Sequence, residues 1–278
     1  MRKNTFKRFI RRKMAVVSAF ILLFFVLIAI LGPIIFRKDP YAIDLRNTRQ
    51  PISKEHWLGT DDLGRDTFTR LVYGTRITLA VSFAGVFIGT VVGVLLGVCA
   101  GYYGGLIDTV LSRLIDIILA FPSLLLAIAV VAILGRGLEN TIIAIAVSST
   151  PSVARMVRSV TLSIRNQEYI MSCEISGVPH RRIIATHVIP NTMSQIIVNT
   201  TLNLGTGILS ASSLSFLGLG VQPPHPEWGA MLSTARDTLR FYPLASLAPG
   251  IAVTLVVLSF SLVGDGLRDA LDPKLKNR

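Results

Sequence analysis

Residues 77–101 read ITLAVSFAGVFIGTVVGVLLGVCAG, a stretch with no charged side chain. A helix of about 20 apolar residues crosses the hydrocarbon core of a bilayer. This run is long enough to do so. It therefore predicts an integral membrane protein, and the rest of the chain is interpreted outward from it.

Further uncharged runs cover residues 14–36, 188–226 and 241–264, with a shorter one at 117–134. The 278 residues are 51% hydrophobic and 16% charged, whereas a soluble domain averages about 25% charged residues. The pattern predicts an all-α, polytopic membrane protein with six transmembrane helices. The expected spans are 14–36, 77–101, 112–134 with a kink at Pro122, 139–157, 194–219 and 244–264.

The distribution of Lys and Arg predicts the orientation, because cytoplasmic loops carry an excess of both. Residues 1–13 hold seven of them, and six spans would leave 17 inside and 11 outside. Both termini are therefore expected in the cytoplasm. The predicted divisions are a cytoplasmic segment (1–13), the first transmembrane helix (14–36), an external loop with short amphipathic pieces (37–74), a core domain of five transmembrane helices (75–267) with a cytoplasmic loop (158–191), and a cytoplasmic tail (268–278).

Several function classes are excluded by composition and by missing motifs. The net charge of +12 fits basic loops that set topology better than nucleic-acid binding. The first apolar run is too long for a cleaved signal peptide and is read as a retained span. Cys99 and Cys173 predict neither a disulfide nor a metal site. The chain has no G-x-x-x-x-G-K-[ST], G-x-S-x-G or H-E-x-x-H motif, so it is not expected to bind ATP by a P-loop or to be an enzyme.

Five glycines repeat every fourth residue within the opening run: Gly85, Gly89, Gly93, Gly97 and Gly101. Small residues at this spacing let another helix approach closely along one seam. The seam is interpreted as internal helix packing, with a sliding interface between moving halves as the sharper alternative.

A polar stripe is predicted on the span at 194–219. Its members are Gln195, Asn199, Asn203, Thr206, Ser210 and Ser213. Such a stripe covers about 27 Å of a helix, and polar groups are costly in lipid. The stripe should line a bundle interior or water-filled path, or else form hydrogen bonds between packed helices. It carries no carboxylate, which disfavours a proton relay.

The segment 168–191 is a polar interruption between two apolar stretches. Gly177 and Pro179 punctuate it, so it is expected to form two short helical pieces joined by a turn. Arg181 and Arg182 lie on the second piece, and His187 follows. Such a segment either docks a partner or is a solvated loop that shields helix ends.

This segment resembles the EAA loop of binding-protein-dependent ABC importer permeases, in which a glycine precedes an Ile-x-Leu-Pro element. Here Gly177 precedes Ile189-Pro190, and Glu168-Tyr169 stands ahead of it. The sequence departs from the pattern at Met171, Cys173 and Glu174, the last of which stands where Arg or Lys is common. Three other stretches resemble the oligopeptide/dipeptide branch, closest to its C-type subunit: 59–76, 213–229 and 264–273. Together they cover essentially the whole chain.

The resemblance implies a type I ABC importer permease in a bacterial inner membrane, surrounded by membrane lipid. It implies a sister permease, two cytoplasmic ATPase subunits that bind ATP and Mg, and an extracytoplasmic substrate-binding protein that delivers small peptides. No cofactor is expected on this chain itself. A coupling helix would map to about Cys173–Arg182, and the residues expected to contact the ATPase are Glu168, Tyr169, Cys173, Gly177, His180, Arg181, Arg182 and Pro190.

Other functions remain as alternatives at this stage. The same machinery in close relatives imports nickel or opine-like compounds, and the cargo is left open, as is pairing with a sister permease or with a second copy. An ion-coupled secondary transporter or channel would need ionisable groups within the spans, and few are present. A membrane enzyme has no supporting motif.

Overall fold

A computed structural model describes residues 8–271, and this part of the chain is all-α, with an isolated bridge between Thr60 and Asp66 but no strand. The helices are α2 (Lys13–Ile35), α3 (Thr67–Tyr103), α4 (Gly105–Leu119), α5 (Ser123–Leu134), α6 (Leu138–Arg165), α7 (Glu168–Ile175), α8 (His180–Ile183), η1 (a π-helix, Ile184–Val188), α9 (Ile189–Phe216), α10 (Trp228–Ala235), η2 (a 3-10 helix, Arg236–Thr238) and α11 (Pro243–Leu271). Parts of the predicted terminal segments, 1–7 and 272–278, lie outside the described residues.

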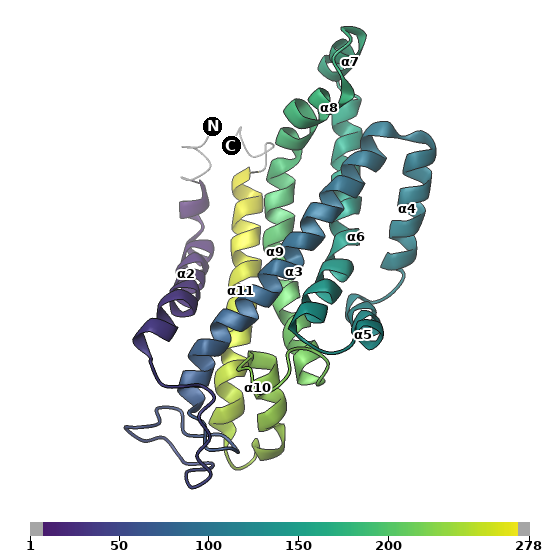
Figure 1. The fold of residues 1–278 in the computed structure, drawn as a ribbon. Coiled ribbons are helices and arrows are strands. Elements are labelled where there is room, and N and C mark those ends of the chain that lie inside the picture. The colour runs from purple at the N-terminus through teal and green to yellow at the C-terminus, as the bar shows by residue number, and fades with distance from the viewer. Residues whose placement is uncertain (1–7, 272–278) are drawn as a thin grey trace.

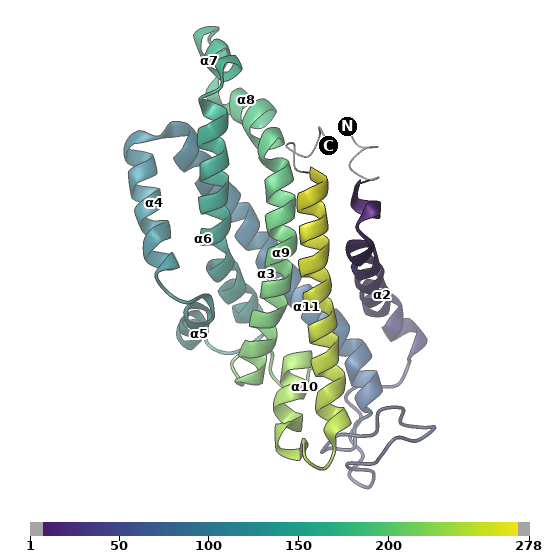
Figure 2. The ribbon, with the colours of Figure 1, turned by 180° about the vertical axis from the view of Figure 1, so that it is seen from behind.

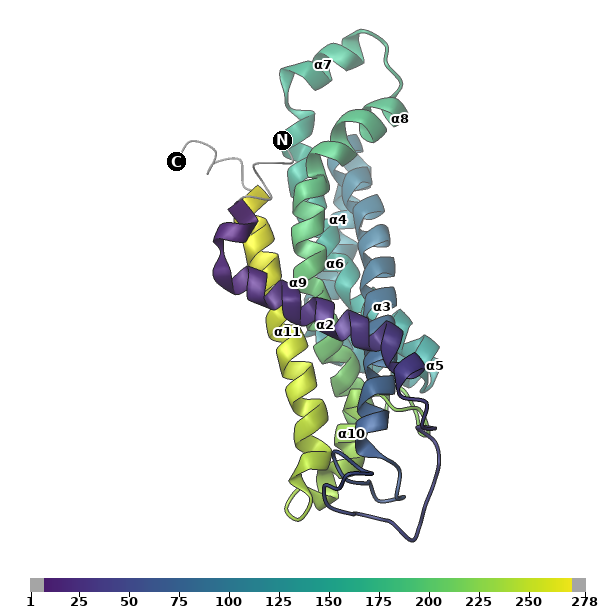
Figure 3. The same cartoon turned by 90° about the vertical axis from the view of Figure 1, so that its left-hand side faces the viewer.

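The long helices form an elongated bundle (Figure 1). The start of α2, the end of α11 and the pair α7–α8 lie at one end, while the loop at 36–66 and α10 lie at the other. Helix α3 packs most extensively on α6, and α9 lies against α3, α6 and α11. Helix α2 crosses the outside of the bundle obliquely, in contact with α11 and α3 (Figure 3).

Among the described residues, three helices are long and apolar enough to cross a membrane: α2, α3 and α11. The bent pair α4–α5 raises this number to four if it counts as one span. Helices α6 and α9 have 28 residues each but carry more polar side chains. Sequence and structure therefore agree on a polytopic helical membrane protein.

The expected span at 112–134 needs correction, because it is not one kinked helix. Helix α4 starts at Gly105 and ends at Leu119, and α5 starts at Ser123 in a direction bent by 93°. Pro122 has no N–H and disfavours helical backbone at the residue before it. The chain therefore breaks at 120–122, and the two helices continue separately.

Several helix ends differ from the expected ones. Helix α3 begins at Thr67 because the Asp66 side chain accepts the Thr69 N–H at 2.7 Å and caps it. The loop at 36–66 has no helix, so the expected amphipathic pieces are not formed there. Helix α6 continues to Arg165, past the expected end at 157, and tolerates Pro151 in its interior. Helix α10 follows the Pro-rich segment 223–226, where only loop was expected.

Candidate functional site

The loop between α6 and α9 projects from the end of the bundle, and α7 lies across the bundle axis there (Figure 3). Helix α7 ends in a Schellman motif, in which Val178 N–H donates to Cys173 O at 3.1 Å and Gly177 N–H donates to Glu174 O at 3.0 Å. Gly177 has φ +74°, a conformation that favours glycine. The expectation of two helical pieces joined at Gly177 is confirmed. A single coupling helix over Cys173–Arg182 is wrong, because this range holds the end of α7, a turn and the start of α8.

The inner face of the loop is part of the hydrophobic core. Ile170, Ile183 and Val188 are fully buried. They form one cluster with residues of three bundle helices, namely Val98, Tyr102, Val153, Val157 and Ile196. The loop is therefore held on the ends of α3, α6 and α9 as a packed unit.

The outer face of the loop is exposed and mixes apolar and basic side chains. Ile175 is 88% exposed and Met171 47%, and Arg181 and Arg182 on α8 are exposed as well. A loop that exposes Ile175 and Met171 together with two arginines presents a surface suited to a protein partner. Ile175 was missed by the sequence reasoning, although an apolar residue directly before a polar turn was a usable signal.

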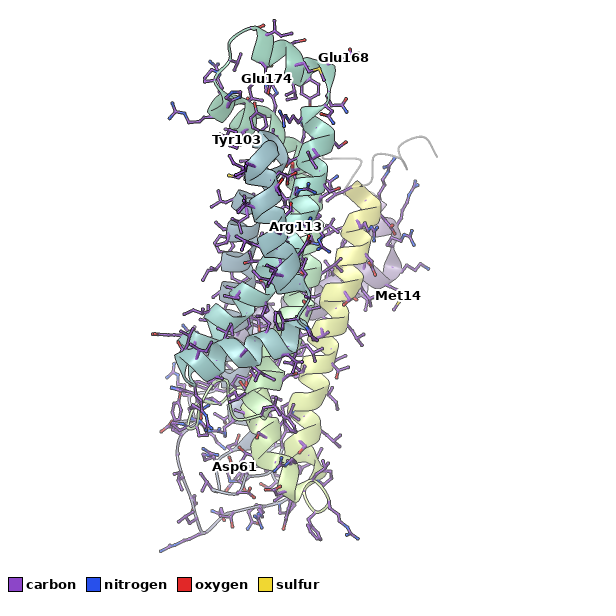
Figure 4. The ribbon with its side chains drawn as sticks, turned by 90° about the vertical axis from the view of Figure 1, so that its right-hand side faces the viewer. Met14, Asp61, Tyr103, Arg113, Glu168 and Glu174 are labelled. Atoms are coloured by element: carbon purple, nitrogen blue, oxygen red, sulfur yellow. The ribbon has the colours of Figure 1, made fainter. Side chains whose placement is uncertain are left out.

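Of the other residues expected in this loop, some are exposed and others contact neighbouring side chains of the protein. Glu168 is the exposed first residue of α7, and Figure 4 shows it with Glu174 at this end of the bundle. The Tyr169 ring lies against His187, with centroids 6.0 Å apart, and Cys173 Sγ is 3.9 Å from His187 Nε2. His180 points to Tyr102, whereas Pro190 is exposed in the first turn of α9.

The polar stripe of α9 is not covered by the chain. Gln195 and Thr206 are exposed, and the other members are half-buried. Its hydrogen bonds run within α9: Asn203 Nδ2 donates to Asn199 Oδ1 at 3.0 Å, and the Thr206 hydroxyl donates to Asn203 O at 3.0 Å. Helix α9 meets α3 through other positions, such as Gly207. The stripe thus lies on an open side of α9, and Figure 2 shows α6, α9 and α11 side by side on the face away from α3.

The five glycines of α3 line its contact with α6, and all five are buried. A Cβ on Gly85 would lie 2.7 Å from Ile145 Cβ, and one on Gly101 would lie 2.8 Å from Arg158 O. Equivalent atoms on Gly89, Gly93 and Gly97 would meet α6 backbone oxygens at 2.5–2.8 Å. The seam lets the two backbones approach more closely than any side chain would allow.

Charged pairs join α4 to α6, and the sequence reasoning missed them. Arg158 Nη2 donates to Asp108 Oδ2 at 2.6 Å, and its Nε contacts Oδ1 of the same carboxylate. Arg155 pairs with Asp116, and both side chains are more than half exposed. Asp116 lies on the last turn of α4, at the end of that helix away from Gly105.

The opposite end of the bundle is tied together by polar groups of distant segments. Arg70, which is 5% exposed, donates from one guanidinium nitrogen to Pro40 O at 2.9 Å and to Pro224 O at 3.3 Å. Asp61, labelled in Figure 4, accepts from Arg65 Nε at 2.7 Å. These contacts give the stretch at 59–76 a structural role, since it joins the loop at 36–66 to the segment before α10.

Glu227 is a fully buried carboxyl group at the same end. It caps α10 by accepting the Ala230 N–H at 2.9 Å, and it accepts the Thr78 hydroxyl at 3.1 Å. Burial raises the pKa of the Glu227 carboxyl, and the hydrogen bonds from backbone N–H groups oppose that rise. The side chain fixes α10 on α3.

Residues 8–271 contain no cluster of three or more His, Cys, Asp or Glu side chains placed to hold a metal ion. Both cysteines are free thiols. The features that stand out are a rigid loop with an exposed tip, an open polar stripe and a tightly packed helix pair.

The fold is that of an ABC importer permease. It is similar to a chain of the MetNI methionine ABC transporter in an inward-facing conformation, with a TM-score of 0.59 and 20% identity, covering 73% of this chain and 97% of that one. It is also similar to a chain of an amino acid ABC transporter solved with histidines, with a TM-score of 0.54 and 16% identity, covering 71% of this chain and 92% of that one.

Residues 93–277 match the family described as binding-protein-dependent transport system inner membrane component, and this chain belongs to that family. Residues 1–51 match the N-terminal transmembrane domain of oligopeptide transport permease C. The chain is accordingly a multi-pass component of a bacterial inner membrane and not an enzyme, since ATP hydrolysis belongs to separate subunits.

Two curated relatives illustrate the branch. The dipeptide transport system permease protein DppC of Alkalihalophilus pseudofirmus is 49% identical over 99% of this chain and 90% of its own length. The glutathione transport system permease protein GsiD of Escherichia coli is 47% identical over 97% of this chain and 89% of its own length.

Proposed function

We propose that this chain is one of two permease subunits that form the path for small peptides in an ATP-driven importer. The relatives named for dipeptide and glutathione transport support a peptide cargo. An extracytoplasmic binding protein delivers the peptide, and two cytoplasmic ATPase subunits, which bind ATP and Mg, supply the energy. A sister permease completes the path.

The topology of this proposal has six spans with both termini in the cytoplasm. Helices α6 and α9 lie within the bundle beside α3, and 28 residues make about 42 Å of helix, enough for a bilayer. The bent pair α4–α5 counts as one span. Arg12 at the start of α2 pairs with Asp269 near the end of α11 at 2.8 Å, which supports a common side for the two ends.

The observation that carries the energy-coupling role is the exposed tip of a packed loop. Ile175 and the arginines of α8 face outward, while Ile170 and Ile183 anchor the same loop in the core. A surface built this way passes a push from a docked ATPase to α3, α6 and α9, because packed interiors transmit displacement. Glu168, Tyr169, Cys173, Gly177, His180 and Pro190 complete the proposed coupling region.

The test of this role is Gly177→Asp. Open space surrounds Gly177, so the side chain itself fits, but it places a bulky charge at the docking surface in a left-handed backbone conformation. We expect normal amounts of permease in the membrane and at least a severalfold loss of ATP-driven dipeptide uptake. Gly105→Asp, a positive-φ glycine also in open space but outside the loop, is the matched control. Normal uptake by Gly177→Asp would refute the assignment.

The stripe on α9 is proposed to line the path, together with the sister subunit. Replacement of Asn199 and Asn203 by Leu should lower uptake while the ATPase subunits remain bound, because the change removes polar surface without touching the loop. Thr201→Leu, on the same helix outside the stripe, serves as the control. If the double variant instead loses its partner subunits, the stripe packs against another helix.

A further inference from the structure

Tyr102 lies where the end of α3 meets both arms of the loop. Its side chain is almost fully buried, with 2% exposed. The hydroxyl donates to Glu174 Oε1 on α7 at 3.0 Å and lies 2.9 Å from His180 Nδ1 on α8. In Figure 4, Glu174 and Tyr103, the neighbour of Tyr102, are labelled at this same end. One phenol thus joins three elements.

The direction of these hydrogen bonds follows from the single proton of the phenol. Because the Tyr102 hydroxyl donates its proton to the Glu174 carboxylate, its oxygen can only accept from His180. His180 must therefore carry a proton on Nδ1, and the chain runs from His180 Nδ1–H to Tyr102 O–H to Glu174 Oε1. The ring of His180 also lies edge-on to Tyr102 and Tyr103, with centroids 5.6 and 6.3 Å away.

The two arms are also joined by the turn at 176–179 and by Ile170 and Ile183, which share one hydrophobic cluster. The exposed tip at Ile175 stands one residue after Glu174, and Arg181 stands one residue after His180. The groups that Tyr102 holds are therefore the immediate neighbours of the groups on the outer face. A shift of either arm changes the position of that face relative to α3.

We propose that Tyr102 is a positioning residue for energy coupling: its hydroxyl fixes α7 relative to α8 and ties both to α3. The proposal rests on the coupling role of the loop. The Tyr102 hydroxyl takes no part in ATP hydrolysis or cargo binding. It fixes the position of the outer face of the loop relative to α3.

Conservative variants test the chain of hydrogen bonds. Tyr102→Phe keeps the buried ring and removes both contacts. His180→Asn keeps an amide N–H near the position of Nδ1, whereas the longer His180→Gln does not. In proteoliposomes with the complete importer, uptake of dialanine per ATP hydrolysed should fall roughly three- to tenfold for Tyr102→Phe and His180→Gln, the scale expected for a lost hydrogen bond. His180→Asn should stay within about twofold of wild type, because it preserves that bond.

Amide hydrogen exchange of the purified permease separates this proposal from the proposed function. Tyr102→Phe should speed exchange in both α7 and α8, with α11 unchanged as an internal reference. Faster exchange in a protein whose wild type shows no ATP-driven uptake would refute the importer role but support the positioning role. Unchanged exchange, or a coupling ratio equal to wild type in Tyr102→Phe, would overturn the proposal. Equal losses in His180→Asn and His180→Gln would overturn the role assigned to the His180 Nδ1 contact, because a polar group kept near that position would then restore nothing.

Discussion

At the scale of single residues, Glu227 shows how an ionisable side chain can have a structural role because it is buried. Its side chain is 1% exposed, and ionising a carboxyl group that is buried to this extent costs folding free energy. It persists because α10 needs an acceptor at its N-terminus and α3 offers the Thr78 hydroxyl to the same group. Glu227 therefore joins α10 to α3.

Glu227 predicts a pH dependence of stability. Burial raises its folded-state pKa, so folding favours the protonated form. The stabilising contribution is full below the ordinary pKa of the carboxyl group and is lost as the pH rises through the raised folded-state value. Glu227→Gln keeps a hydrogen-bond acceptor but cannot ionise.

Thermal unfolding in detergent between about pH 4 and 8 measures this effect. The wild-type midpoint should fall relative to that of Glu227→Gln as the pH rises. Glu227→Ala should be less stable than either at every pH, because it leaves the Ala230 N–H without its partner. Parallel pH profiles for wild type and the Gln variant would contradict the prediction.

At the scale of elements, the contact of α3 with α6 is set by the absence of side chains. A Cβ on Gly93 would lie 2.7 Å from Val153 Cβ and 2.8 Å from Thr150 O. Backbone oxygens cannot move aside without shifting α6 as a whole. The seam therefore fixes the distance between the two helices as well as their angle.

Gly93→Ala is expected to destabilise the bundle by about 1–3 kcal/mol, the usual range for overpacking. Gly250→Ala is the matched control, because Gly250 also lies within a helix but its added Cβ would have no neighbour closer than 3.7 Å. The control should be neutral or slightly stabilising, since Ala favours helix over Gly. The thermal unfolding midpoints of the two variants test this prediction. Equal midpoints would show that the contact of α3 with α6 has room for an added methyl group.

Prediction from the sequence was most accurate for elements that depend on residues close together in the chain. The apolar runs located the apolar helices α2, α3 and α11, and Gly177 located the turn between α7 and α8, because these signals act within a few residues. Pro122 was correctly seen as a disturbance, but its result, a 93° bend, depends on how α4 and α5 pack on α6. The pairs Asp108–Arg158 and Tyr102–Glu174 join residues 50 and 72 positions apart, and spacing in one sequence does not show them.

At the scale of the whole molecule, the two ends of the bundle face different compartments in the proposed topology. One end carries the loop with α7 and α8, and the other carries Asp61 and Arg70. Helices α6, α9 and α11 run between them (Figure 2), and α9 carries the polar stripe. The proposed import of peptides requires the end with α7 and α8 to face the cytoplasm, where the ATPase subunits lie.

Sided labelling checks the orientation. In a background with Cys99 and Cys173 replaced, Ile175→Cys should react with a membrane-impermeant maleimide only when the cytoplasmic face is open. Trp57→Cys, at an exposed position of the loop at 36–66 (56% exposed), should react from outside in intact cells. Labelling of Ile175→Cys in intact cells would contradict the proposed orientation and favour the opposite one.

The guanidinium of Arg70 has a consequence for how the protein is made. Its partners are the carbonyls of Pro40 and Pro224, the second of them 154 residues further along the chain. While the chain is being synthesised, Arg70 reaches its place long before Pro224 exists. This end of the bundle therefore stays unfinished until Pro224 has been synthesised, and its closure is a late step of biogenesis.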